Sequence, residues 1–104
     1  MFETNEYFDG KVKSIAFEST LPSSENSSTK TTKPATVGVM AVGNYVFNTA
    51  DKEKMIVVSG AMRVKFSDSD DITTFQEGDS FEVDANSSFD VSIQQETAYL
   101  CIYG

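Results

Sequence analysis

Glu53 to Phe66 reads EKMIVVSGAMRVKF, and Gly60 divides this stretch into two short segments that are rich in aliphatic residues. The first segment is a continuous apolar run. In the second, Met62, Val64 and Phe66 alternate with polar or charged residues, which places them on one face of an extended strand. Glycine at the division suits a turn that requires open backbone angles. The stretch therefore predicts two consecutive strands that meet at Gly60.

The rest of the chain repeats this pattern of short apolar segments separated by Gly, Asp, Asn and Ser. No helical stripe of about ten residues or more interrupts it. Many short strands divided by turn residues predict an all-β sandwich or barrel. The predicted strands are Gly10–Phe17, Ala35–Thr49 (one long strand or a hairpin bent at Gly43-Asn44), Lys54–Ser59, Ala61–Phe66, Thr73–Phe75, Ser80–Val83, Phe89–Gln94 and Ala98–Tyr103.

One segment has a different composition from the remainder of the 104-residue chain. Residues 18–36 read ESTLPSSENSSTKTTKPAT, in which Leu21 is the only large apolar residue. Such a segment cannot bury enough apolar surface to offset its chain entropy. Because the whole chain has the length of one domain, we expect a single domain over residues 1–104 with a flexible Ser/Thr-rich loop at about residues 19–34.

The charge and the rare residues exclude several classes of function. Sixteen acidic against eight basic residues give a net charge of −8 at pH 7, which predicts neither a nucleic acid nor a membrane as partner. The chain has no histidine, so neither a Ser-His-Asp relay nor a metal site that needs imidazole can form. Proton transfer would fall to a carboxylate, Tyr, Lys or Cys with a shifted pKa. The single Cys101 and an N-terminus without signal-peptide features predict a cytoplasmic protein.

Two spacings resemble the motifs of the cupin fold, a small double-stranded β-barrel of the jelly-roll type. The first cupin motif ends in Glu, six residues and Gly, and Glu53 and Gly60 stand at that separation here. The second motif begins with a glycine that Gly78 matches, two residues before the start of the predicted strand Ser80–Val83. The resemblance implies that the all-β domain is a single cupin-like barrel.

The same resemblance implies that this barrel holds no metal. A metal-binding cupin uses three histidines and the motif glutamate as ligands. Here the histidine positions fall near Phe47, Thr49 and Phe89, and only Glu53 remains. Since one carboxylate cannot replace three imidazoles, we expect a cupin that has lost its metal site.

Further segments match a particular family in order and spacing: NEYFDGKVKSI (5–15), VGVM (37–40), YVFNTA (45–50), MIVVSGA (55–61), FEVDANSSF (81–89) and YLC (99–101). Together they resemble the small metal-free cupins called pyrimidine/purine nucleoside phosphorylases. The resemblance implies a pentosyltransferase that reversibly converts diverse purine and pyrimidine nucleosides, with inorganic phosphate as co-substrate and no cofactor, to free base and α-D-ribose 1-phosphate. Ile102 stands where some relatives carry a basic residue, and Asp84 where Pro is common.

Glu53 is the leading candidate for a catalytic group. Cleavage of a glycosidic bond passes through an oxocarbenium-like state, in which a general acid can protonate the departing base. The fold resemblance points Glu53 into the mouth of the barrel, where burial would raise its pKa. The alternative is an exposed carboxylate in the charged turn at residues 51–54, and Asp84 is a weaker second candidate for the acid.

Aromatic side chains are the candidates for binding the base, because stacking suits a broad base specificity. The predicted substrate-binding residues are Tyr45, Phe47, Thr49, Phe89 and Tyr99, with the Thr49 hydroxyl as a donor to ribose or phosphate oxygens. The alternative for the aromatics is plain core packing, and the hydroxyl of a strand threonine is usually structural.

Phosphate requires a cationic patch on this acidic chain. Arg63 is the only arginine and can bind phosphate in a bidentate manner, and Lys54 lies beside Glu53. Arg63 shares strand parity with Lys65, however, so both point to solvent if Met62 and its neighbours face the core. Lys54 can equally belong to a surface ion pair.

Two other functions stay open at this point. One is a non-catalytic cupin that binds a nucleoside or sugar as a sensor. The other is an isomerase or epimerase acting on a sugar derivative, which the lack of histidine disfavours. In each case we expect a homodimer through strand contacts, because pairing protects exposed sheet edges.

Overall fold

The computed structural model describes residues 2–21 and 31–104. The elements of regular secondary structure in this part of the chain are all β-strands. The strands are β1 (Thr4–Tyr7), β2 (Val12–Leu21), β3 (Thr31–Met40), β4 (Gly43–Asn48), β5 (Glu53–Ser59), β6 (Ala61–Phe66), β7 (Ile72–Gln76), β8 (Ser80–Val83), β9 (Ser88–Ile93) and β10 (Thr97–Tyr103). The all-β fold predicted from the strand pattern is confirmed.

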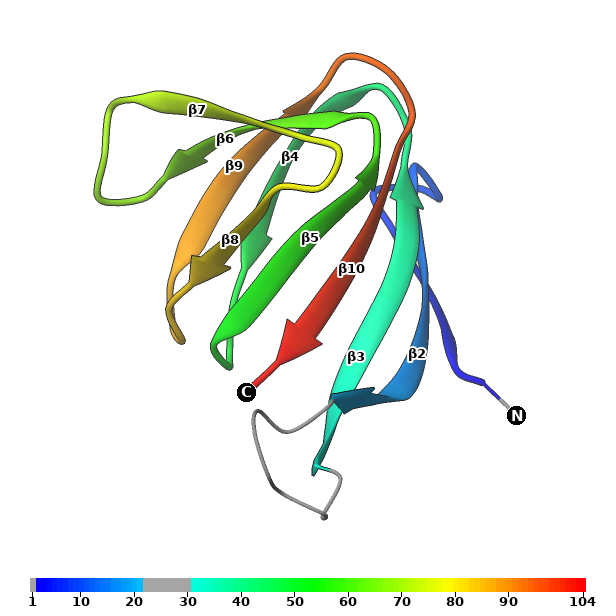
Figure 1. The fold of residues 1–104 in the computed structure, drawn as a ribbon. Helices are drawn as coiled ribbons and strands as arrows, with labels where there is room; N and C mark the ends of the chain where they lie inside the picture. Colours follow the sequence, from blue (N-terminus) through cyan, green and yellow to red (C-terminus); the bar gives the residue numbers. More distant parts are fainter. Residues whose placement is uncertain (1, 22–30) are drawn as a thin grey trace.

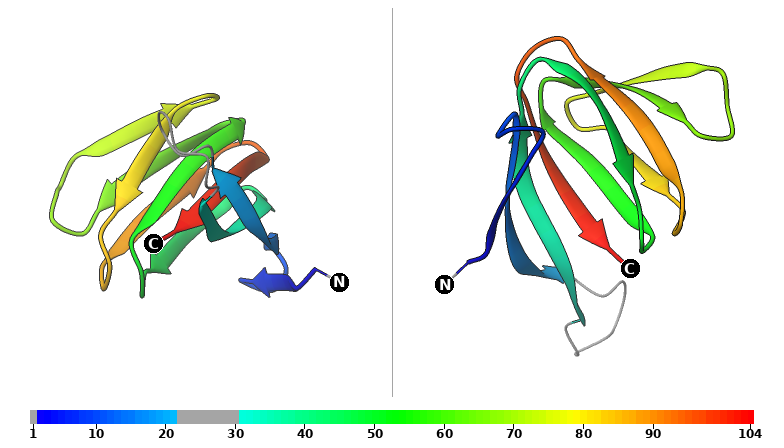
Figure 2. Two further views of the ribbon diagram at one scale, coloured as in Figure 1. Left: turned by 60° about the horizontal axis from the view of Figure 1, so that its bottom comes forward. Right: turned by 180° about the vertical axis from the view of Figure 1, so that it is seen from behind.

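The strands form two antiparallel sheets that pack face to face (Figure 1). One sheet has six strands in the order β1-β2-β3-β10-β5-β8, and the other has four in the order β4-β9-β6-β7. Figure 2 shows the four-stranded sheet from behind, as a separate layer. The sheets therefore form a jelly-roll sandwich and are not joined into a closed barrel.

The chain passes from one sheet to the other six times, and two of these crossings bear on the predicted strands. Residues 35–49 were expected to form one strand or a hairpin, but β3 lies in the six-stranded sheet and β4 in the four-stranded one. The chain likewise crosses from β5 to β6 at Gly60, where φ is +92°. A Cβ atom on Gly60 would lie 2.5 Å from Thr97 Oγ1, so this crossing requires glycine.

Two segments differ from the expectation at the N-terminal side. Strand β1 was not predicted; it pairs with β2 from Thr4 opposite Ile15 to Tyr7 opposite Val12. Strands β2 and β3 pair as far as Leu21 opposite Thr31, so both ends of the segment predicted as a loop at about residues 19–34 are strand. The remainder of that predicted loop, residues 22–30, lies outside the described residues.

The hydrophobic core lies between the two sheets. The shared face predicted for Met62 and Val64 on β6 points inward, since both are fully buried, and Phe66 on the same face is half-buried. Phe89 and Val91 on β9 are fully buried as well. Alternate residues on these strands face outward, as the period of two requires. None of the described residues belongs to a helix that is long and apolar enough to cross a membrane.

Candidate functional site

A cavity of about 150 Å³, called the Glu53 cavity below, lies between the sheets. Strands from both sheets line it. Four of its residues were predicted site residues, namely Phe47, Glu53, Phe89 and Tyr99. Six were not: Tyr7, Ser14, Asn48, Met55, Cys101 and Tyr103.

Glu53 is the first residue of β5 and points toward the core, because it shares strand parity with the buried Met55. Burial is the main cause that raises the pKa of the Glu53 carboxyl group above its ordinary value. The Cys101 thiol donates a hydrogen bond to Glu53 Oε1 at 3.5 Å, which lowers this pKa, and the charge of Asp51 raises it. The net effect is a carboxyl group that keeps its proton to higher pH than an exposed glutamate.

Two phenylalanines form an aromatic wall of the cavity. Phe47 on β4 and Phe89 on β9 are cross-strand partners, and their rings stack with centroids 5.5 Å apart and planes 28° from parallel. Phe89 is buried, whereas Phe47 is half-buried. The two rings therefore form an apolar wall of the cavity, in which one face of each ring is turned toward the other ring.

Tyr99 on β10 reaches the cavity because its cross-strand neighbour is glycine. Gly38 lies opposite Tyr99 on β3, and a Cβ atom there would lie 2.8 Å from the Tyr99 hydroxyl oxygen. The same Cβ atom would lie 2.4 Å from the Lys13 carbonyl oxygen, so no other residue fits without a shift of the strands. Gly38 thus provides the space that the phenol ring occupies.

The polar groups around Glu53 are neutral donors. Burial raises the pKa of Tyr99 to about 12, and it also raises the pKa of the Tyr103 hydroxyl and the Cys101 thiol. All three therefore keep their protons at neutral pH. Among the described residues that line the cavity there is no lysine or arginine.

Two predicted substrate-binding residues have structural contacts instead. The buried Tyr45 donates its hydroxyl hydrogen bond to the Ala41 carbonyl at 2.6 Å. The buried Thr49 donates to the Asp84 carbonyl at 2.6 Å and accepts from the Ser87 amide at 2.9 Å. Thr49 thus joins the end of β4 to the turn before β9, and neither residue lines the Glu53 cavity.

The structure does not bring the predicted phosphate ligands to Glu53. Lys54 is exposed and follows Glu53 on β5, so its side chain leaves the opposite face of the sheet. Arg63 is exposed on the outer face of the four-stranded sheet, which confirms the solvent-facing alternative. Asp84, the second candidate for the acid, is exposed as well. Within the described residues the one ion pair joins Lys52 to Glu82, at 3.3 Å, rather than involving Lys54.

The sequence carried a signal for two of the residues that were not predicted. Tyr99, Cys101 and Tyr103 alternate on β10 and therefore share one face, so the prediction for Tyr99 could have been extended to both. Tyr7 and Ser14 belong to β1 and β2. Both lie in the family-like segment NEYFDGKVKSI (5–15), but no apolar alternation distinguished their side chains from their neighbours.

The residues of the cavity do not fit the metal that many cupins hold. Phe47 and Phe89, near two of the expected histidine positions, offer no donor atom, and Thr49 near the third is occupied by backbone contacts. Within the described part of the chain, no three His, Cys, Asp or Glu side chains converge as a metal site requires. The chemistry of this cavity is that of a carboxyl group among phenols, a thiol and aromatic rings.

A second, larger cleft adjoins the Glu53 cavity. It has a volume of about 750 Å³ and a largely apolar lining that includes Phe2, Phe17 and Pro34. Tyr103 lines both the cleft and the cavity, and its hydroxyl is hydrogen-bonded to Thr36 Oγ1 at 3.2 Å. The Tyr103 side chain therefore borders both spaces.

Comparison with known proteins assigns the family. The model of the family described as "Pyrimidine/purine nucleoside phosphorylase" matches residues 2–103. A protein of that name from Psychromonas ingrahamii is 51% identical over 98% of this chain and 97% of its own length. A crystal structure of a protein of unknown function from Vibrio parahaemolyticus has a TM-score of 0.85 and 39% identity, and the match covers 100% of this chain and 99% of that one. An RmlC-like cupin from Shewanella frigidimarina, 17% identical, aligns with a TM-score of 0.68 over 98% of this chain and 82% of its own. It confirms the cupin-like fold.

Proposed function

Because the chain belongs to the pyrimidine/purine nucleoside phosphorylase family, we propose that it catalyses the reversible phosphorolysis of purine and pyrimidine nucleosides. The products are the free base and α-D-ribose 1-phosphate. The observation that carries this proposal is the half-buried Glu53 carboxyl group, held with a raised pKa in a cavity with a stacked aromatic wall. A relative that carries the name of this family is 51% identical to the chain.

Glu53 acts as the general acid in this proposal. The glycosidic C–N bond breaks, its electron pair goes to the base, and the Glu53 carboxyl group supplies the proton. A phosphate oxygen forms the new bond to C1′ of the ribose. Hydrogen phosphate loses its own proton when it becomes the ester, and that proton restores the Glu53 carboxyl group, so the cycle closes without a cofactor or metal.

The aromatic wall of Phe47 and Phe89 binds the base by stacking. Every nucleobase has a π-face, so a stacking surface accepts purines and pyrimidines alike. The two rings already stack on each other at 5.5 Å, which fixes the wall before a ligand enters. Broad base specificity follows from this arrangement because the wall reads no hydrogen-bonding edge.

Phosphate binding falls to neutral donors. The hydroxyl groups of Tyr99 and Ser14 and the amide of Asn48 line the cavity, whereas Lys54 and Arg63 lie on outer faces. The phenol of Tyr99 keeps its proton at neutral pH, since its pKa is about 12. A protonated Glu53 adds a further donor and removes the charge that would repel an anion.

The substrate extends beyond the Glu53 cavity. Small-molecule pockets commonly measure about 300–1,000 Å³, so a cavity of about 150 Å³ holds only part of a nucleoside. The adjoining cleft of about 750 Å³ supplies the remaining space once Tyr103 leaves Thr36. In this proposal the Tyr103 side chain is the partition between the cavity and the cleft, and its movement away from Thr36 admits the substrate.

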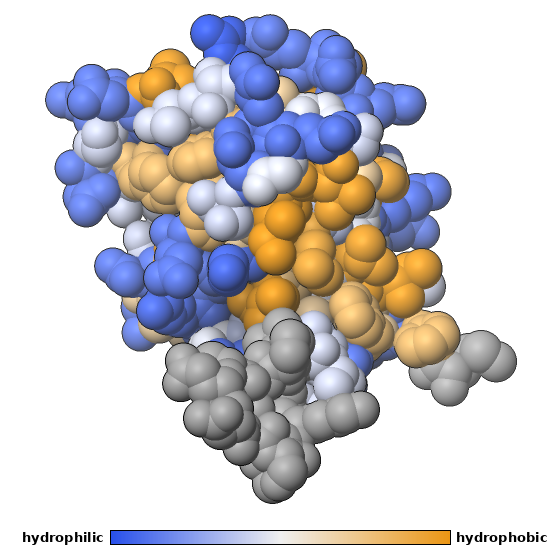
Figure 3. Space-filling view, in the orientation of Figure 1, coloured by the Kyte–Doolittle hydropathy of each residue, from blue (hydrophilic) through white to orange (hydrophobic). Residues whose placement is uncertain are grey.

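In this proposal the protein forms a homodimer. The two copies contact each other through the outer face of the six-stranded sheet rather than through a strand edge. Ile15, Val37, Leu100 and Ile56 are successive cross-strand partners on β2, β3, β10 and β5. Figure 3 shows the apolar band that runs over these strands. Ile15 and Val37 are 43% and 42% exposed. A row of aliphatic residues without charge lets two copies of a chain of charge −8 approach each other.

The proposed partners and compartment follow from the net charge of the chain and from its single cysteine. The partners are nucleosides and phosphate, without nucleic acid or membrane, because the net charge is −8. The single, buried Cys101 fits a reducing compartment such as the cytoplasm.

Incubation of the purified protein with inosine or uridine, with and without phosphate, tests the activity. Chromatography should detect free base and ribose 1-phosphate only when phosphate is present, and treatment with a chelator should leave the rate unchanged. Base release without phosphate would indicate a hydrolase. Nucleoside binding without turnover would indicate the sensor.

A further inference from the structure

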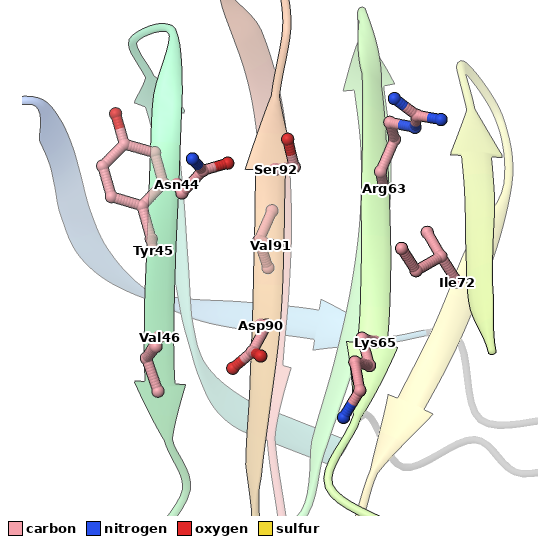
Figure 4. Close-up of a pocket in the computed structure, with 9 residues that line it drawn as sticks. All are labelled: Asn44, Tyr45, Val46, Arg63, Lys65, Ile72, Asp90, Val91 and Ser92. Carbon is pink, nitrogen blue, oxygen red and sulfur yellow. The ribbon is translucent and has the colours of Figure 1, made fainter. Parts of the chain in front are cut away.

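The outer face of the four-stranded sheet carries a groove of about 390 Å³ on the side away from the Glu53 cavity (Figure 4). Asn44, Ser92 and Arg63 are successive cross-strand partners on β4, β9 and β6. Figure 4 shows their side chains in one row across the sheet. A second row lies two residues along the strands and contains Asp90 and Lys65 as cross-strand partners. Neighbouring strands lie about 4.8 Å apart, so each row brings its side chains within reach of one ligand.

The groove is a local cationic patch on an acidic protein. Arg63 and Lys65 supply two positive charges against the single carboxylate of Asp90. Among the described residues, neither cation has an acidic group within ion-pair distance. The Arg63 guanidinium therefore keeps its planar fork of donors for an external anion, and bidentate binding of phosphate is its preferred use.

The remaining lining suits a polyhydroxylated ligand. Asn44 and Ser92 both donate and accept hydrogen bonds, and the Asp90 carboxylate accepts them from a diol. Ile72, which is 62% exposed, forms an apolar side of the groove that can cover a carbon skeleton. The volume lies within the range of small-molecule pockets, about 300–1,000 Å³.

We propose that this groove is a second binding site, for a small phosphorylated sugar, in which Arg63 holds the phosphate while Asn44, Ser92 and Asp90 bind the sugar hydroxyls and Lys65 lies at the other end of the groove. The groove lies on the outer face of the four-stranded sheet and the Glu53 cavity on its inner side, and none of the described residues lines both. The site therefore binds independently of the reaction, and the inference does not depend on the proposed activity.

Titrations followed by two-dimensional ¹H–¹⁵N NMR test this site, with ribose 5-phosphate, inorganic phosphate and ribose as separate probes. We expect saturable shifts at the backbone amides of Arg63, Ser92 and Asp90 with ribose 5-phosphate, and weaker binding of phosphate or ribose alone. Replacing Arg63→Gln should weaken ribose 5-phosphate binding at least about tenfold, as expected for the loss of a charge-assisted pair of hydrogen bonds. Lys11→Gln is the matched control, because it removes the same charge from an exposed turn residue outside the groove.

Three outcomes would overturn the proposal. The first is the absence of saturable shifts in the groove. The second is equal affinity for phosphate and ribose 5-phosphate, which would indicate an anion site that does not contact the sugar. The third is an equal effect of Lys11→Gln and Arg63→Gln, which would indicate general electrostatics. Shifts around Glu53 report on the catalytic cavity and are read separately, so failure of the proposed function and failure of this site are distinguishable.

Discussion

The Sγ atom of Cys101 lies 3.5 Å from Oε1 of Glu53, so a buried thiol on β10 donates a hydrogen bond to the carboxyl group that begins β5. This hydrogen bond stabilises the charged form of Glu53, whereas burial destabilises it. The proton affinity of Glu53 is thus set by two opposing contributions, one of which can be removed by a single substitution.

Replacing Cys101→Ala should move the pH profile of phosphorolysis to higher pH. Glu53 works in its protonated form, so the rate falls as the pH rises through its pKa. Removing the thiol takes away a hydrogen bond that lowers this pKa, so the pKa rises and the alkaline limb of kcat/KM moves to higher pH. Rates measured between pH 5 and 9 report this shift.

Cys101→Ser is the matched control, because its hydroxyl keeps a donor at the same position. Its alkaline limb should lie at or below that of the unmodified protein. If the alanine variant shifted downward, or if both variants gave the same profile, Cys101 would have no role in setting the pKa of Glu53.

Replacing Gly38→Ala should displace Tyr99 and lower stability. The new Cβ atom would lie 2.4 Å from the Lys13 carbonyl oxygen and 2.8 Å from the Tyr99 hydroxyl, so the strands must shift. Overpacking of this kind costs about 1–3 kcal/mol of unfolding free energy, which chemical denaturation measures. Gly78→Ala is the control, since nothing lies within 4 Å of a Cβ atom there and only its positive φ of 91° opposes the change. An effect at Gly38 smaller than at Gly78 would contradict the account of Tyr99.

Tyr103 should control substrate entry through its contact with Thr36. Tyr103→Phe removes the 3.2 Å hydrogen bond but keeps the ring, so the partition opens more easily and KM falls modestly. Tyr103→Ala merges the cavity with the cleft and loses ring contacts, so KM should rise while nucleosides with bulkier bases become relatively better substrates. Steady-state kinetics with inosine and uridine distinguish the effects of the two substitutions on KM. An unchanged KM in both variants would show that the substrate does not cross this partition.

A charge placed in the apolar row should separate the proposed dimer. Val37→Glu puts a carboxylate at the centre of this row, and burying like charges across an interface costs several kcal/mol, so the dimer should weaken by about a hundredfold or more. Val42→Glu is the control, because Val42 is 59% exposed in the crossing between β3 and β4. Sedimentation velocity measures how far each of the two variants dissociates into monomers. Dissociation by both variants, or by neither, would argue against this contact face.

The sequence predicted the centre of the site better than its surroundings. Glu53, Phe47 and Phe89 were predicted because motif spacing along the chain determines where each stands on its strand. The outward direction of the Arg63 side chain could also be predicted. Side chains alternate between the two faces of a strand, and Met62 and Val64 on either side of Arg63 point inward. In each case the deciding information is local, within one strand.

What the sequence did not reveal depends on contacts between distant segments. Tyr7 belongs to a short polar strand, β1, whose existence depends on pairing with β2. The crossing at residues 41–42 places β4 in the other sheet, and no residue type there distinguishes a crossing from a hairpin. Thr49 was predicted as a ligand contact, but the turn before β9 uses its hydroxyl.

The general-acid role of Glu53 is tested most directly by comparing two substrates in the Glu53→Gln variant. Inosine requires a proton on its departing base, whereas 4-nitrophenyl riboside releases a stable anion and requires none. The account predicts that kcat for inosine falls about a hundredfold or more, the usual contribution of a general acid. The rate with the nitrophenyl riboside should stay nearly unchanged. An inosine rate within about threefold of the unmodified protein, or an equal loss with both substrates, would contradict it, because a general acid contributes at least about a hundredfold and only where a proton is needed.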